Sequence, residues 1–127
     1  MKAALASLLV VLSAWFVWAP DASADPEAGK SLFESIEGGN CKSCHYTSKL
    51  RMVGPGLENV TRRHSHEWLR VWLHDPMGTW KGDHPETREL KERTRKMKVP
   101  ATSCVKKPMD EAQVGDLLDY LNTLETD

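Results

Sequence analysis

Apolar residues recur at helical spacing along the chain, and the first such segment predicts a helix over residues 26–37. Phe33 and Ile36 fall on one face of this helix. Asp25 is a favourable N-cap and Pro26 suits the first helical position, while two glycines follow the segment and end it. The predicted helix leads directly into the most distinctive motif of the chain.

Two helices are predicted in the middle of the chain. The first begins after Ser65 and ends at Asp75, where Pro76 follows, and its apolar residues repeat at i, i+1, i+4 and i+5. These residues are Trp68, Leu69, Trp72 and Leu73. Residues 77–85 are expected to form a loop because they contain glycines and a proline, and residues 86–97 are expected to form a helix that is mostly exposed to solvent.

The clearest amphipathic helix is the last one, which begins after the N-cap residue Asp110. Gln113 stands at the capping-box position, and Met109 and Val114 are spaced as a hydrophobic staple. The buried face is expected to consist of Val114, Leu117, Leu118 and Leu121. No stretch alternates between apolar and polar residues as a strand would, so the predicted fold class is all-α.

The N-terminal residues have the features of a cleavable secretory signal. Lys2 precedes an apolar run over residues 3–18, and Ala22-Ser23-Ala24 has the form of a cleavage site. The run is shorter than the roughly 20 residues that a membrane-spanning helix needs. The sequence therefore predicts a signal peptide over residues 1–24, one domain over residues 25–127, a periplasmic location and no stable membrane anchor after cleavage.

The charges nearly balance, since 17 Lys and Arg residues oppose 18 Asp and Glu residues to give a formal net charge of −1. Nothing in this balance favours nucleic acid as a partner. A single small domain of this length has a marginal core on its own, so a large apolar cofactor would add to its stability.

Residues 41–45 read Cys-Lys-Ser-Cys-His, which is the pattern of a c-type haem attachment site. In such a site Cys41 and Cys44 form thioether bonds to the porphyrin, and His45 ligates the iron from the proximal side. A redox-active thiol pair would need a βαβ pattern that is absent, a zinc site would need a fourth ligand nearby, and a disulfide at this spacing is uncommon. The predicted cofactor is one covalent haem c, and export to an oxidising compartment is consistent with it.

The segment after the motif predicts support for the proximal histidine. Residues 53–57 read Val-Gly-Pro-Gly-Leu, in which two glycines around a proline allow a close approach to another surface. A metal-bound histidine usually donates its second ring N–H to a nearby carbonyl. We expect the Pro55 carbonyl to accept that hydrogen bond from His45, although an ordinary surface turn would have the same residues.

The whole domain resembles the class I c-type cytochromes, which are small all-α proteins wrapped around one haem. Gly29-x-x-x-Phe33 and Leu117-x-x-Tyr120 are similar to the N-terminal and C-terminal helix motifs of that family. The turn around Pro55 is similar to the family's proline turn. The resemblance implies about four helices, crossing terminal helices, and a role for Arg63 in facing a haem propionate.

The family's second iron ligand is usually a methionine before the last helix, and the resemblance points to Met97. Met109 is the alternative, but its staple position should occupy it with packing against the last helix. The remaining alternatives for the second iron ligand are Met77, a histidine such as His84, or an open sixth position.

Cys104 is a third cysteine outside the attachment motif. Three roles stay open for it: a buried inert thiol, an intermolecular disulfide, or competition with Met97 for iron as a thiolate.

The favoured function is one-electron transfer by a His/Met-ligated haem, without an enzymatic activity of its own. A haem subunit of an oxidoreductase complex, for example one that oxidises sulfur compounds, and a ligand-binding haem sensor are the alternatives. Basic residues near the motif and the proposed methionine loop would steer acidic redox partners into transient complexes, or would form only a solvated face. These residues are Lys42, Lys49, Arg51, Lys96, Lys98, Lys106 and Lys107.

Overall fold

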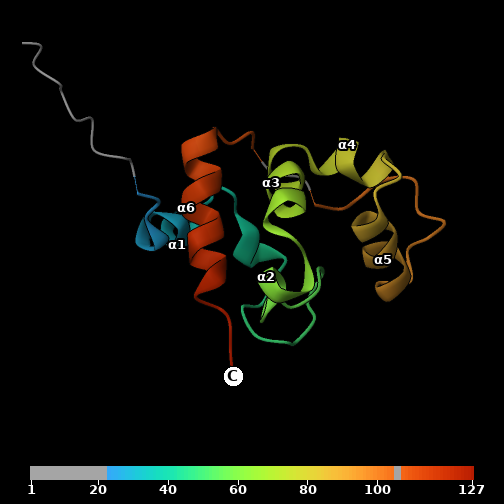
Figure 1. Cartoon of the computed structure of the whole chain (residues 1–127), viewed down its shortest axis with the longest axis horizontal. Helices are drawn as coiled ribbons and strands as arrows, with labels where there is room; N and C mark the ends of the chain where they lie inside the picture. The colour runs from blue at the N-terminus through green and yellow to red at the C-terminus, as the bar shows by residue number, and fades with distance from the viewer. Residues whose placement is uncertain (1–22, 105–106) are drawn as a thin grey trace, which may run out of the picture.

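The computed structural model describes residues 23–104 and 107–127, and this part of the chain consists of helices joined by irregular segments, without a strand (Figure 1). The predicted all-α fold class is therefore confirmed. The elements in order are α1 (Pro26–Glu34), the 3₁₀-helix η1 (Cys41–Ser43), α2 (Val60–Arg63), α3 (His66–His74), α4 (Pro76–Lys81), α5 (Pro85–Arg93) and α6 (Glu111–Asn122). Most of the predicted signal segment, residues 1–22, lies outside the described residues. None of the described helices is long and apolar enough to cross a membrane.

Helices α1 and α6 cross at close range, as the resemblance implied, and they lie side by side in Figure 1. A Cβ atom on Gly29 would lie 2.0 Å from the Asp116 carbonyl oxygen, so only glycine fits at this contact. The rings of Phe33 and Tyr120 meet one turn away with centroids 5.4 Å apart. The Asp25 backbone N–H donates to the Asp116 carboxylate at 2.8 Å. The two ends of the domain are thereby held together beside the attachment motif.

Helix α1 is shorter than predicted, because Ser35 ends it. The backbone at Ser35 is extended, and the Ser35 hydroxyl accepts hydrogen bonds from the N–H groups of Glu37 and Gly38 at 3.1 and 3.3 Å. A serine that satisfies nearby backbone donors in this way competes with the helix. Ile36 consequently lies beyond the helix and is 75% exposed, so its predicted place on the buried face was wrong.

The predicted loop over residues 77–85 was wrong, because α4 occupies most of it. Asp75 ends α3 and also caps α4, with its carboxylate accepting from the Gly78 N–H at 2.8 Å. The aspartate and proline that stop one helix therefore start the next. The predicted helix over residues 86–97 ends early, at Arg93, and Arg95 has a positive φ of 58°.

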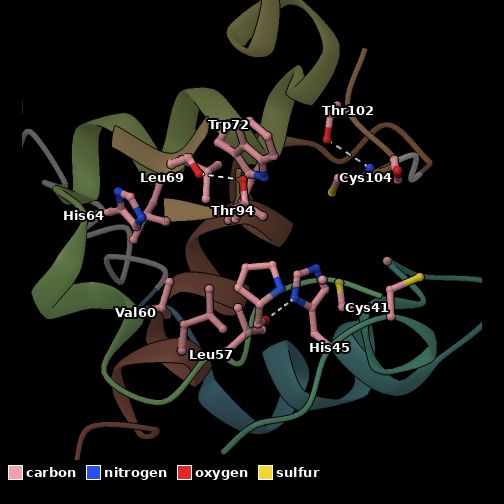
Figure 2. Close-up of a pocket in the computed structure, with 18 of the residues that line it drawn as sticks. Cys41, His45, Leu57, Val60, His64, Leu69, Trp72, Thr94, Thr102 and Cys104 are labelled. Atoms are coloured by element: carbon pink, nitrogen blue, oxygen red, sulfur yellow. Dashed lines mark hydrogen bonds between the residues drawn. The ribbon is translucent and has the colours of Figure 1, made fainter. Parts of the chain in front are cut away.

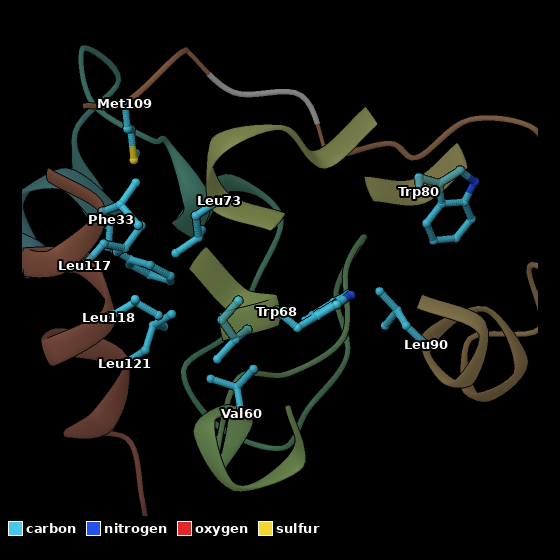
Figure 3. Close-up of a cluster of buried hydrophobic side chains, with 12 residues drawn as sticks. Phe33, Val60, Trp68, Leu73, Trp80, Leu90, Met109, Leu117, Leu118 and Leu121 are labelled. Carbon is cyan, nitrogen blue, oxygen red and sulfur yellow. The ribbon is translucent and has the colours of Figure 1, made fainter. Parts of the chain in front are cut away.

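One apolar core joins α6 to the opposite side of the molecule (Figure 3). The capping box of α6 is confirmed in full, and the predicted buried face on α6 is at most 5% exposed. Met109 is 8% exposed within the same core, as its predicted packing role requires. Trp68 lies in the middle of this core and donates from its indole to Thr87 at 3.0 Å.

Candidate functional site

The attachment motif and the proline turn meet as predicted. Nδ1 of His45 lies 2.7 Å from the Pro55 carbonyl oxygen. Because a carbonyl can only accept, Nδ1 carries the proton and Nε2 keeps a lone pair. Burial lowers the pKa of His45, and the bond to Pro55 acts in the opposite direction more weakly. A neutral, oriented imidazole is the form that binds a metal ion.

Gly54 lets the turn approach the imidazole this closely. A Cβ atom at position 54 would lie 2.2 Å from Cε1 of His45, so any side chain there would displace the ring. The Gly54 N–H also donates to the Cys44 carbonyl at 2.8 Å. Motif and turn thus form one short unit that holds the histidine.

His45, Cys41 and Cys44 line a common cavity, and Figure 2 shows His45 and Cys41 within it. Most of the remaining wall is apolar and comes from the core helices and the segment after the motif. Its members include Leu57, Val60, Leu69, Trp72, Leu73 and Leu90. Apolar walls of this kind exclude water and suit a large flat apolar ligand.

Arg63 lies in the wall of the cavity, and its role in facing a haem propionate stays a prediction. Its guanidinium donates to the carbonyl oxygens of Glu58 and Gly56, the latter at 2.9 Å. Its Nε is buried and has no hydrogen-bond partner among the described residues. Burial lowers the pKa of Arg63, and the charge of Arg93 lowers it further. A carboxylate at this place would complete the hydrogen bonding and offset the repulsion.

His64 and Arg93 line the cavity too, although the sequence analysis did not select them. His64 is 5% exposed and stacks on Trp68 with ring centroids 4.5 Å apart. Arg93 donates to its Nε2 at 3.0 Å, so its Nδ1 carries the proton and faces the Glu86 carboxylate at 3.2 Å. The partners come from α5, so no local motif in the sequence could have indicated the cluster.

The distal side differs from the expectation. Met97 is 51% exposed and is not among the residues that line the cavity, so its role as an iron ligand stays a prediction. Met109 is buried in the core and Met77 lies in α4, and neither lines the cavity. His84 is the N-cap of α5 and accepts from the Glu86 N–H at 3.2 Å. Cys104 does line the cavity.

A helical domain closed by crossing terminal helices, with two thiols and one oriented imidazole on a shared apolar cavity, defines a haem-binding protein of the c type. The family model for cytochrome c matches residues 26–125, and the chain belongs to that family. A search of curated proteins found no match to the chain. Members of the family carry covalent haem c and transfer electrons through its iron, generally as carriers rather than enzymes, and are typically periplasmic or extracellular.

The residues present fit haem c. The cavity combines the paired thiols and the neutral imidazole with apolar walls that suit the porphyrin faces. The buried Nε of Arg63 lacks a hydrogen-bond acceptor within the described part of the chain, and the charge of Arg93 lies near it. Anionic groups at this edge of the cavity would satisfy both residues, and the haem propionates would supply them.

Proposed function

We propose that the protein is a periplasmic one-electron carrier whose haem is held by Cys41, Cys44 and His45. The observation that carries this proposal is the shared cavity, which Cys41, Cys44 and His45 all line and beside which Nδ1 of His45 is hydrogen-bonded to the Pro55 carbonyl at 2.7 Å. The apolar run over residues 3–18 after Lys2 and the cleavage pattern at residues 22–24 support export.

Different residues of the chain would have different roles in an electron carrier. When bound, haem c supplies one iron centre that gains or loses one electron. Cys41 and Cys44 would hold the porphyrin covalently, while Pro55 keeps the ring of His45 in one orientation. Arg63 would bind a propionate, and the apolar walls would keep water from the iron. Rigid ligands and a dry surrounding keep the structural change on electron transfer small.

Basic residues around the motif and the distal segment would guide the redox partners. Lys42, Lys49, Arg51 and Lys98 are exposed, whereas Lys96 lies in the cavity wall. Lys107 forms an ion pair with Glu37 at 2.8 Å, and Lys106 lies outside the described residues. A cationic surface at the haem edge attracts acidic partners into short-lived complexes, and salt weakens the attraction.

Expression in a bacterial host that exports proteins and attaches haem tests this function. We expect the periplasmic fraction to contain a protein that begins at Asp25, keeps its haem on a denaturing gel and is reduced reversibly by one electron. A protein that is exported and folded but keeps no haem on the gel would refute the proposal. Replacing the exposed lysines by glutamines should slow electron transfer to an acidic partner at low salt but not at high salt.

A further inference from the structure

We propose that Cys104 supplies the second axial ligand of the haem iron, as a thiolate, in place of Met97. This inference deepens the proposed carrier function and rests on it. Cys104 lines the same cavity as His45. Figure 2 shows it across the cavity from the imidazole, with its sulfur atom directed into the space between them. The two side chains are thus placed to approach one flat group from its two faces.

Few other side chains in the cavity wall can donate to iron. Apart from the attachment motif, the lining residues with a nitrogen or sulfur of the right type are His64, Lys96 and Cys104. Both ring nitrogens of His64 are engaged, one by Arg93 and the other by Glu86. Binding iron through His64 would break one of these two part-buried contacts.

Lysine and methionine are poorer candidates in this structure. Lys96 ends in an ammonium group, which is strongly hydrated and has no lone pair for iron until it loses a proton. Met97 is 51% exposed and lies outside the cavity lining, so it would have to turn inward from solvent. Met109 would have to leave the apolar core, where it is 8% exposed.

The distal segment is anchored so that Cys104 stays on this wall. Trp80, which is 3% exposed, donates from its indole to the Val99 carbonyl at 2.9 Å. Thr102 is 9% exposed, and its hydroxyl accepts from the Cys104 N–H at 3.1 Å. The chain is therefore held at Val99 and at Thr102, which both lie shortly before the cysteine.

Thiolate ligation has a defined chemical balance. The Cys104 thiol would give its proton to solvent and its sulfur would donate an electron pair to the iron, so that no electron is transferred in that step. The anionic sulfur favours Fe(III) over Fe(II), because a negative ligand stabilises the more highly charged ion. The carrier would therefore have a lower reduction potential than one with a methionine ligand.

Spectra of the purified holoprotein test the assignment. The ferric wild type should be low-spin, with the electron paramagnetic resonance pattern of a thiolate ligand and without the charge-transfer band of a methionine–iron bond. Cys104→Ser should lose the thiolate pattern and bind carbon monoxide when reduced. Cys104→Met should raise the reduction potential, and the matched control Met97→Leu should keep the wild-type spectra.

Each possible failure has a different meaning. A methionine–iron band in the wild type that Met97→Leu or Met109→Leu removes would overturn the Cys104 assignment while leaving the carrier function intact. Wild-type spectra that survive in Cys104→Ser would overturn it as well. A wild type that retains no covalent haem would refute the carrier function itself. Because the wild-type spectra alone discriminate between sulfur ligands, the test does not depend on the variants folding.

Discussion

The two walls of the cavity are built in different ways. The proximal wall, residues 41–57, is a short stretch that bonds to itself, with the His45 N–H donating to the Cys41 carbonyl at 2.9 Å and the Leu57 N–H to the Tyr46 carbonyl at 3.0 Å. The distal wall, residues 94–104, is irregular and depends on contacts with other elements, such as the indole of Trp80. The proximal wall can be predicted from sequence because its hydrogen bonds are local. The distal wall cannot, because its path depends on the packing of distant helices.

The largest expected effect comes from removing the thiols of the proximal wall. The double variant Cys41→Ala/Cys44→Ala should keep no covalent haem, because no thioether bond can form. Haem-stained denaturing gels measure this loss. Cys104→Ala is the control from the distal wall and should stain like the wild type. A stained double variant would mean that the haem is held elsewhere.

The helix crossing beside the proximal wall gives the next effect. Gly29→Ala should destabilise the protein by about 2–3 kcal/mol, because its Cβ would lie 2.0 Å from the Asp116 carbonyl oxygen. Gly115→Ala is the control within α6, where the nearest atom would be 3.7 Å away. This second change should stabilise the helix by about 0.5–1 kcal/mol. Chemical denaturation compares the two, and equal effects would argue against a tight crossing.

Gly54→Ala tests the fit between the proline turn and the proximal histidine. Its Cβ would lie 2.2 Å from the ring of His45, so we expect about 1–3 kcal/mol of destabilisation and an altered ferric spectrum. Gly82→Ala is a control near the distal side, where the nearest atom would be 3.4 Å away. The control should leave the spectrum unchanged.

A smaller effect is expected from the anchor of the distal wall. Trp80→Phe removes the indole N–H that donates to the Val99 carbonyl, which should cost about 1 kcal/mol. The loosened segment should also let cyanide bind the ferric protein faster. Stopped-flow absorbance measures the rate, and an unchanged rate would show that this bond does not hold the distal wall.

The smallest effect concerns acid stability through His64. Burial lowers the pKa of His64, while Glu86 and Glu89 raise it and Arg93 lowers it. As pH falls below the unfolded value of about 6.5, the unfolded state takes up the proton first, so the folded state loses stability. His64→Gln should flatten the decline in unfolding free energy between pH 7 and 5. If the unfolding free energy of His64→Gln declined as steeply as that of the wild type, the decline would come from other titratable groups.

Much of the fold could be predicted from local sequence. Asp110 with Gln113 and Ser65 with its following apolar repeat mark helix starts through their own side-chain bonds to the backbone, and both were confirmed. Helix α4 was missed because the aspartate and proline at its start were interpreted only as a stop. Ile36 was misplaced because Ser35 competes for the backbone just before it.

The sequence by itself determined the proximal half of the site, because the bond between His45 and the Pro55 carbonyl arises within one short segment. Only the tertiary structure decided which sulfur faces the cavity opposite the histidine. Met97 and Cys104 lie in the same irregular stretch, where spacing alone cannot tell inward from outward. The contact of Trp80 with Val99 and the burial of Thr102 set the path of that stretch, so that Cys104 lines the cavity and Met97 is exposed.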